Sequence, residues 1–525
     1  MPPYPAAVGE QQSSGVHLAE IVAAVSVAGD LGLGQPLEHM LRSCALATRM
    51  AQDLGAAEED VDATYWVTLF TTAGCIGTSW ELSRFFGDDI AFRADMYGLK
   101  PSNAAFFGYL FKSLGAGRSP VSKARIRATM LLTGMGELQQ SFVAHCAVNA
   151  AMADRLGLGE HVATGLLQTF AQWDGKGIPK GVGGEELTFA IRIGNLANHV
   201  EVVAREQDVD ASKEVARAFA GSQYDPQVCE LWCDNAESLL KGLDDVSTWE
   251  DVVAAAPRGR RVLTEAELED ALELLADFAD LKSPWFTGHS RGVSALAAAA
   301  ARRAGLPEGD VTTLRRAALV HDIGRAGVPN SIWDKEGPLT TSEQEKVRLH
   351  AYFTERVLSR AGKLSQLGPV AAAAHERSDG TGYPKAVTTS SVPLLARYLE
   401  AADCYQAMTA DRPHRPALSP AVAALELRRA VQEGSLDGGA VDAILAVAGH
   451  PVRRSPSAPA GLTPREVEVL VLAAHGATTK AIASKLGIAP KTAGNHLERV
   501  YAKAGVGSRA EAAMFAMQHG LVGTA

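Results

Sequence analysis

The segment LVHDIGRAG, residues 319–327, places a histidine directly beside an aspartate within a frame of apolar and small residues. The segment LFTTAGCIG, residues 69–77, has the same apolar and glycine frame, but Thr71 and Thr72 stand where His321 and Asp322 stand. Two segments of one pattern in one chain indicate an internal repeat. The later segment keeps side chains that can bind a metal, and the earlier one does not.

The spacing of other polar residues extends this repeat over most of the chain. Four intervals match: 32 residues for 289–321 and 39–71, 29 for 350–379 and 145–174, 18 for 379–397 and 174–192, and 6 for 397–403 and 192–198. The interval 71–145 is 74 residues long, whereas 321–350 is 29, so the first copy carries an insertion of about 45 residues near 77–140. We predict two tandem copies of one domain, a first repeat at 15–240 and a second repeat at 263–450.

Apolar residues recur at helical spacing through most of the chain, as in LEDALELLADFADL, residues 268–281. Thr264 precedes Glu267 in the spacing of a capping box, which predicts a helix start. With 525 residues, the chain is too long for one hydrophobic core. The fold class is therefore predicted to be mainly α, with a proline- and serine-rich linker at 451–460 before a small domain at 461–525.

The N-terminal residues show no basic segment followed by an apolar one, and no run of about 18 apolar residues occurs anywhere. We therefore expect a cytoplasmic protein with no membrane partner.

The second repeat concentrates residues of the metal-binding type. They are His289, His321, Asp322, His350, His375 and Asp403, each within or at the edge of an apolar helical pattern. In the first repeat, four of the matching positions are Thr71, Thr72, Phe170 and Asn198. Mixed imidazole and carboxylate ligands suit iron, manganese, zinc or nickel. Since neighbouring side chains on a helix project about 100° apart, Asp322 can bridge two divalent ions beside His321. The alternative is a set of histidines that only pack in the core.

These residues carry a family resemblance. The segments DLKSPWFTGHSRGV, HDIGR, RLHAYFTERVL, HERSDGTGYP and ARYLEAADCYQAMTADRPHRP together resemble the HD-GYP branch of the HD-domain phosphohydrolases. The resemblance implies an all-α fold, a cluster of two or three metal ions and hydrolysis of cyclic di-GMP. It implies that the six residues above are metal ligands, that Asp322, Arg325 and Arg377 act in catalysis, and that Gly380, Gly382, Tyr383 and Pro384 form the substrate loop.

Three positions depart from the family pattern. Ala374 stands where the family commonly has a further histidine, and Ser378 replaces the usual tryptophan. Trp285 occupies the place of the glutamate found in members with three metals, so two ions are expected. The first repeat resembles the family more faintly and keeps only His39 and His145, which predicts a packing or dimer-contact role, with a small-molecule pocket as the alternative.

The C-terminal residues 461–525 contain short amphipathic segments separated by glycine or proline. From residue 461 onward, seven basic and four acidic residues give +3, whereas the whole chain carries −10. The segments LTPREVEVL, IASKLGIAPKTAGNHL and KAGVGSRAEA resemble the LuxR-type helix-turn-helix domain, which implies binding to double-stranded DNA. A recognition helix is predicted at 490–504, with Lys491, Thr492, Asn495, His496 and Arg499 as candidate DNA contacts.

Two hypotheses follow for the whole chain. In the first, it is a homodimeric transcription regulator whose HD-type body hydrolyses or senses cyclic di-GMP or a related nucleotide. In the second, the body is a catalytically inactive sensor or dimerisation scaffold, and the DNA-binding domain carries the function.

Overall fold

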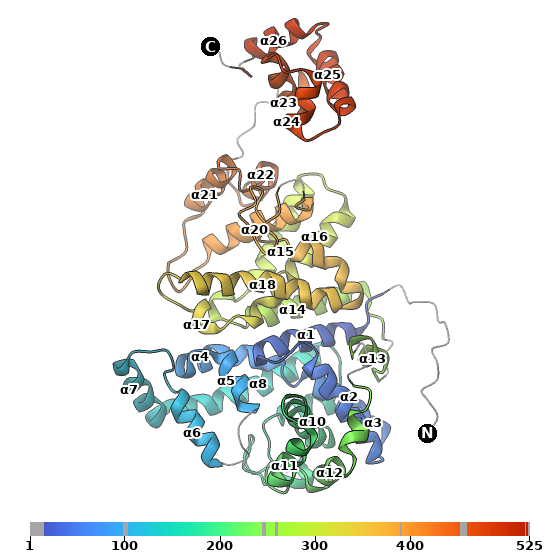
Figure 1. The fold of residues 1–525 in the computed structure, drawn as a ribbon, viewed down its shortest axis with the longest axis vertical. Coiled ribbons are helices and arrows are strands. Elements are labelled where there is room, and N and C mark those ends of the chain that lie inside the picture. The colour runs from blue at the N-terminus through green and yellow to red at the C-terminus, as the bar shows by residue number, and fades with distance from the viewer. Residues whose placement is uncertain are drawn as a thin grey trace, which may run out of the picture. The chain divides into compact units, whose positions relative to one another are not determined.

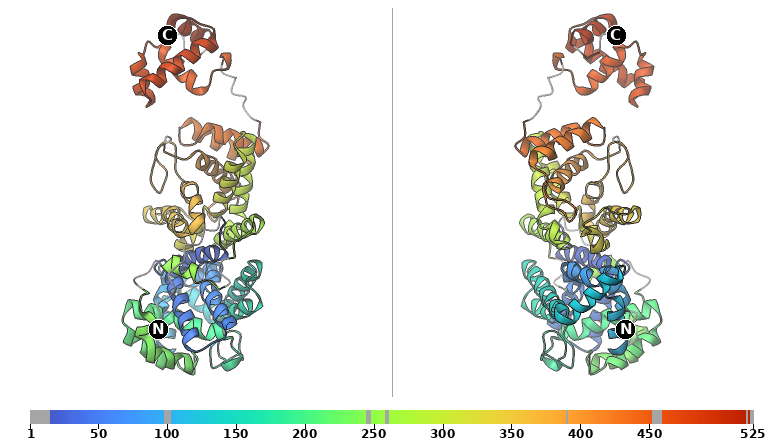
Figure 2. Two further views of the ribbon diagram at one scale, coloured as in Figure 1. Left: turned by 90° about the vertical axis from the view of Figure 1, so that its right-hand side faces the viewer. Right: turned by 90° about the vertical axis from the view of Figure 1, so that its left-hand side faces the viewer.

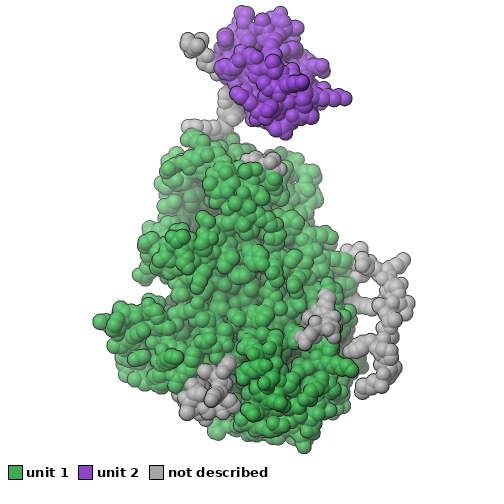
Figure 3. All heavy atoms as spheres, viewed as in Figure 1, with its two compact units in different colours: residues 1–450 green, residues 451–525 purple. Residues whose placement is uncertain are grey.

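A computed structural model describes residues 15–97, 103–243, 248–257, 261–388, 391–451, 459–519 and 521–522. Within these ranges the chain is built from helices and contains no strand, only a few isolated bridges between single residues. It divides into two compact units, Met1–His450 and Pro451–Ala525 (Figure 3). The predicted mainly α fold is confirmed. Most of the predicted linker 451–460 lies outside the described residues.

The first repeat forms a helical bundle in the first unit (Figure 1). Its helices are α1 (Leu18–Leu33), α2 (His39–Asp53), α3 (Glu58–Phe70), η1 (Ala73–Thr78), α8 (Met135–Arg155), α9 (Glu160–Leu167), η3 (Gly184–Glu186), α10 (Phe189–Glu206), α11 (Val209–Phe219) and α12 (Pro226–Leu240). Helix α13 (Thr248–Ala254) follows before the second repeat. Apolar side chains of α2, α10 and α12, including Trp232, form a core of their own.

The insertion expected near 77–140 is helical. It comprises α4 (Ser79–Phe86), α5 (Asp89–Tyr97), α6 (Asn103–Ser113), α7 (Pro120–Thr129) and the π-turn η2 (Met130–Gly134). Phe85, Phe86 and Leu114 build a separate small core there.

The longer helices of the second repeat follow the order of those of the first repeat, with shorter elements between them. It comprises α14 (Glu265–Asp280), η4 (Pro284–Phe286), α15 (His289–Arg303), α16 (Glu308–Val320), η5 (Ile323–Gly327), α17 (Asn330–Trp333), α18 (Thr341–Arg360), η6 (Gly362–Leu367), α19 (Gly368–Ala371), α20 (Leu394–Thr409), α21 (Pro420–Gln432) and α22 (Gly438–Val447). Thr264 accepts a hydrogen bond from the backbone N–H of Glu267 and so caps α14, as its spacing predicts.

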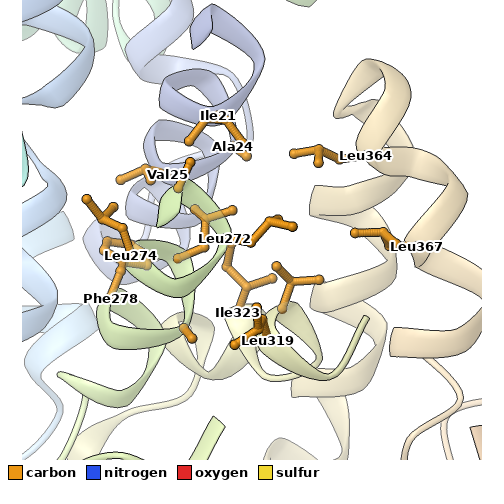
Figure 4. Close-up of a cluster of buried hydrophobic side chains, with 14 of the residues drawn as sticks. Ile21, Ala24, Val25, Leu272, Leu274, Phe278, Leu319, Ile323, Leu364 and Leu367 are labelled. Atoms are coloured by element: carbon orange, nitrogen blue, oxygen red, sulfur yellow. The ribbon is translucent and has the colours of Figure 1, made fainter. Parts of the chain in front are cut away.

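The two repeats share one hydrophobic core. Helix α1 is buried on nearly all sides, and its Ile21, Ala24 and Val25 belong to one apolar cluster with Leu272 of α14 and Ile323 of η5 (Figure 4). Both further views show the two bundles of the first unit joined along this layer of helices (Figure 2). An all-apolar helix is stable in water only when it is covered on every side. The second repeat therefore provides part of the cover for the first helix of the first repeat.

The second unit is a four-helix domain. Its helices are α23 (Pro464–Ala474), α24 (Thr479–Leu486), α25 (Pro490–Ala504) and α26 (Arg509–Gln518), preceded by the short turn η7 (Pro459–Gly461). Gly487 ends α24 with φ 64°, a left-handed conformation that favours glycine, and so allows the tight turn into α25. The recognition helix predicted at 490–504 is α25. Among the described residues, no helix is long and apolar enough to cross a bilayer.

Candidate metal centre and substrate cavity

Five elements of the second repeat bring the six predicted ligands together. His289 begins α15, His321 and Asp322 lie at the end of α16, His350 is in α18, His375 follows α19, and Asp403 is in α20. Gly324 makes this arrangement possible, because a side chain at its position would collide with the backbone carbonyl of His350. The close approach of η5 to α18 thus sets His321 and Asp322 beside His350.

The six side chains form two adjacent groups that share Asp322. One group contains His289, His321, Asp322 and Asp403, and the other contains Asp322, His350 and His375. Asp322 Oδ2 lies 2.8 Å from His321 Nε2, and Asp322 Oδ1 lies 3.3 Å from His350 Nε2. Asp403 Oδ1 lies 3.0 Å from His289 Nε2. The two oxygens of one carboxylate thus face two different sets of imidazoles.

The buried atoms of this cluster fit a metal centre. His321 and Asp322 are completely buried, yet His321 Nε2 and both oxygens of Asp322 make no hydrogen bond of acceptable geometry. Buried polar atoms without such partners are rare and costly unless they pair or bind an ion. The other ring nitrogen of His321 hydrogen-bonds the carbonyl of Ala318 at 2.7 Å, which turns Nε2 toward the carboxylates.

The charges of the cluster depend on close mutual contact. Burial alone would raise the pKa of Asp322, but the Arg325 guanidinium and the His321 imidazole hold that pKa well below its usual range. Burial alone would lower the pKa of His321, but the carboxylates of Asp322 and Asp403 raise it to about 10. The neighbouring imidazoles likewise hold the pKa of Asp403 well below its usual range, so both carboxylates are ionised near neutral pH, as metal ligands must be. The imidazole of His321 would have to give up its proton when a metal ion binds.

A cavity of about 660 Å³ opens beside the cluster, and basic residues line much of it. The lining residues with positive charge are Arg325, Lys335, Arg348, Arg377, Arg412 and Arg415. The Arg325 guanidinium carbon lies 4.1 Å from the centre of the Phe286 ring, and its NH2 group contacts Asp322. Arg377 Nε lies 3.2 Å from Glu400 Oε1. Such a surface suits a ligand that carries phosphate groups.

Two of the four residues of the predicted substrate loop line the cavity, and the other two do not. Gly382 and Tyr383 line the cavity, and the Tyr383 ring stacks on His375 with 5.1 Å between ring centres. Gly380 and Pro384 shape the loop and are not part of the lining. The buried Glu376 fixes the loop, since its carboxylate accepts the backbone N–H groups of Lys385 at 2.6 Å and Val387 at 3.0 Å.

Sequence reasoning missed several residues of the cavity. Arg412, Arg415 and Trp333 were not predicted, although the first two stand in the quoted segment ADRPHRP. The two arginines within that short segment could have indicated a binding site for phosphate groups. Trp333 gave none, because nothing in its local sequence shows that α17 packs beside the cluster.

The matching position of the first repeat is closed by hydrogen bonds between protein groups. His39 Nδ1 lies 2.6 Å from Glu201 Oε2, and its Nε2 lies 2.9 Å from Asn198 Oδ1. His145 Nε2 hydrogen-bonds the Thr71 carbonyl at 2.9 Å. Phe170 packs against the His145 ring at 4.8 Å between ring centres. Since burial lowers the pKa of His145 to about 4, this imidazole is neutral near neutral pH.

The predicted DNA contacts lie on one face of α25. Lys491, Thr492, Asn495 and Arg499 are exposed, whereas Ala493, Leu497 and Val500 are buried. His496 is only half-buried, and its Nδ1 is buried without a hydrogen-bond partner in the described structure. Exposed polar residues on a second helix after a tight turn are the arrangement that enters a major groove.

Comparison with known proteins agrees with this geometry. Residues 273–439 match the family model described as HD domain, and residues 460–516 match the one described as bacterial regulatory proteins, luxR family. The 3′3′-cGAMP-specific phosphodiesterase 3 of Vibrio cholerae is 30% identical over 405 residues, which cover 76% of this chain and 88% of that protein. The chain belongs to the HD-GYP-type phosphodiesterases.

Two further comparisons extend this relationship. A crystal structure of a cyclic GMP-AMP-specific phosphodiesterase of V. cholerae covers 83% of this chain and 98% of its own, with a TM-score of 0.58 and 25% identity. The cyclic di-GMP phosphodiesterase of Thermotoga maritima is 34% identical over 151 residues, covering 28% of this chain and 40% of that protein. This HD-GYP-type chain therefore joins a phosphodiesterase-family body to a LuxR-type DNA-binding domain.

Proposed function

We propose that the second repeat binds two divalent metal ions and hydrolyses a phosphodiester bond of a cyclic dinucleotide. The observation that carries this proposal is Asp322, whose two oxygens belong to two adjacent ligand groups beside a basic cavity. A carboxylate shared in this way suits a pair of ions. Iron, manganese, zinc and nickel all suit the mixed imidazole and carboxylate set.

Each residue has a defined part in this reaction. His289, His321 and Asp403 would hold one ion and His350 and His375 the other, with Asp322 between them. The bound ions would supply a water molecule that is deprotonated near neutral pH. Arg325 and Arg377 would bind the phosphate oxygens and orient phosphorus for attack by that water, which breaks one P–O bond of the ring and leaves a linear dinucleotide. The ring of Tyr383, which lines the cavity and is only partly buried, would offer a stacking surface for a base.

The relatives limit the substrate class. Those named above are phosphodiesterases specific for 3′3′-cGAMP or active on cyclic di-GMP. The six cations around the cavity suit a ligand with two phosphates. We therefore propose cyclic di-GMP or 3′3′-cGAMP as the substrate of this chain.

Because the DNA-binding domain is joined to the proposed nucleotide site in one chain, we propose that the chain is a nucleotide-responsive regulator. LuxR-type domains commonly read paired half-sites as dimers, so we propose that the chain acts as a homodimer on double-stranded DNA. Lys491, Thr492, Asn495 and Arg499 would contact the major groove or the phosphates beside it.

Metal analysis after anaerobic purification, followed by product analysis with both cyclic dinucleotides, tests the proposal. We expect two metal equivalents and a linear dinucleotide product. Nucleotide binding without turnover by metal-loaded protein would instead favour the inactive sensor. That alternative has two observations on its side, Ala374 in place of a family histidine and Ser378 in place of the usual tryptophan.

A further inference from the structure

We infer that Asp89, in the insertion of the first repeat, is a positioning residue for the substrate cavity of the second repeat. The inference rests on the proposed function only for its kinetic consequence, because the contact itself is structural. Asp89 does not line the cavity; it acts through α17, which forms one wall of it.

Asp89 is fully buried between the two repeats. Its Oδ1 accepts the backbone N–H of Asn330 at 2.7 Å, at the first residue of α17. Its Oδ2 accepts hydrogen bonds from Lys282 Nζ at 3.0 Å and from Arg93 NH1 at 3.0 Å. Lys282 is also completely buried, so both charges have left water and depend on this contact.

The hydrogen bond to Asn330 matters because α17 is very short. A helix of four residues leaves most of its first N–H groups without partners inside the helix. Asp89 supplies one partner from a different domain of the chain. Within the second repeat, Asp334 provides a second anchor, since it accepts hydrogen bonds from Ser283 Oγ and Asn330 Nδ2 at 2.6 Å each.

Trp333 transmits the position of α17 to the site. Its Nε1 donates a hydrogen bond to the Arg325 carbonyl at 3.4 Å, and its ring lies 5.7 Å from the His350 ring and 5.3 Å from the Phe286 ring. Trp333 and the neighbouring Ile332 line the cavity. A shift of α17 therefore moves the wall that faces the substrate while the six ligands stay on their own helices.

Asp89 is the first residue of helix α5, and the last residue of α5 reaches the closed site of the first repeat. Tyr97, the last residue of α5, donates a hydrogen bond to Asn198 Oδ1 at 3.3 Å, and its ring lies 6.0 Å from the His39 ring. Helix α5 thus starts at the wall of one site and ends over the other. Through this placement the first repeat would position one wall of the substrate cavity without taking part in the chemical step.

Two double variants of the full-length chain test the inference. In Asp89→Asn/Lys282→Met, one amide oxygen remains as an acceptor beside the Asn330 N–H and Arg93, whereas in Asp89→Ala/Lys282→Met no acceptor is left there. Both variants carry the same charge, and in both Arg93 keeps its hydrogen bonds to the carbonyls of Gly32 and Cys75. The two variants therefore differ in whether residue 89 can still accept a hydrogen bond from α17.

We expect the alanine variant to raise KM for the cyclic dinucleotide by about 10-fold relative to the asparagine variant, the effect of about one lost hydrogen bond. Bound metal and kcat should agree within about 2-fold, because the ligands do not move. Hydrogen exchange of the peptide that contains α17 should be faster in the alanine variant. Equal exchange in the two variants would overturn the inference, as would equal KM values. If the parent protein hydrolyses no nucleotide, the proposed function fails and the exchange measurement alone decides.

Discussion

His39 and His289 begin corresponding helices in the two repeats, yet their ring nitrogens have different surroundings. His39 contacts Glu201 and Asn198 through both nitrogens, whereas the nitrogens of His289 are buried without a hydrogen bond of good geometry. Among the described residues, the same backbone frame thus holds one site whose polar atoms are joined by hydrogen bonds and one whose imidazoles and carboxylates lie close together without such bonds. An unsatisfied buried cluster is a stronger sign of function than the presence of histidine itself.

The largest test of this contrast is Asp322→Ala. It removes the carboxylate shared by the two ligand groups, so the protein should lose at least one metal equivalent. Turnover should fall by on the order of 1000-fold, the upper range for removal of one preorganised electrostatic group. Elemental analysis and product formation measure the two effects. Full metal content in this variant would contradict the placing of Asp322 between two ions.

The second test addresses the stability of the closed site. Burial alone would raise the pKa of Glu201, but His39 and Arg42 lower it to about 2 from an ordinary value of 4.5. A lowered pKa means that the ionised carboxylate stabilises the folded state above about pH 4.5, and that this stabilisation is lost as the pH falls toward 2. Glu201→Gln should therefore lower the free energy of unfolding by about 3 kcal/mol near neutral pH.

Denaturant unfolding at about pH 6 and about pH 3 checks this sign, since the difference between parent and variant should shrink at the lower pH. An equal difference at both values would mean that packing, not charge, accounts for the loss. Metal content should stay unchanged in the variant.

The third test asks whether the second repeat controls DNA binding. A nucleotide that favours one arrangement of the body should change DNA affinity by about 5- to 150-fold, the usual range of coupling free energies of about 1–3 kcal/mol. Titration of labelled DNA at fixed salt, with and without cyclic di-GMP in the Asp322→Ala background, measures this. Arg499→Ala should weaken DNA binding by about 1–3 kcal/mol if it contacts a base, with metal content unchanged. Identical curves in all nucleotide states would leave the body as a scaffold.

The smallest expected effect comes from Thr72→Ala, at the position that matches Asp322. Thr72 Oγ1 is buried without a hydrogen-bond partner in the described structure, so its removal leaves nothing unpaired. Metal content and turnover should match the parent protein. A measurable loss of either would contradict the separation of the two sites.

Much of this cluster could be predicted because the matching intervals of the two repeats indicated which histidines and aspartates lie together. Matching intervals located both sites, and the substitution of Thr71 and Thr72 for His321 and Asp322 distinguished them. The closing of the first site by Glu201 and Tyr97 could not be predicted, because both contacts join residues far apart in the chain. The same reason hid Asp89 and Trp333, whose roles depend on how the insertion packs against the second repeat.

Because the two repeats share one core around α1, loss of either repeat would expose apolar side chains of the other. A gene shortened to the second repeat alone would remove Ile21 and Val25 from the apolar cluster that contains Leu272 and Ile323 (Figure 4). The exposed apolar surface would favour aggregation. The first repeat therefore helps to keep the second repeat soluble, and residues 15–450 should melt in a single cooperative transition.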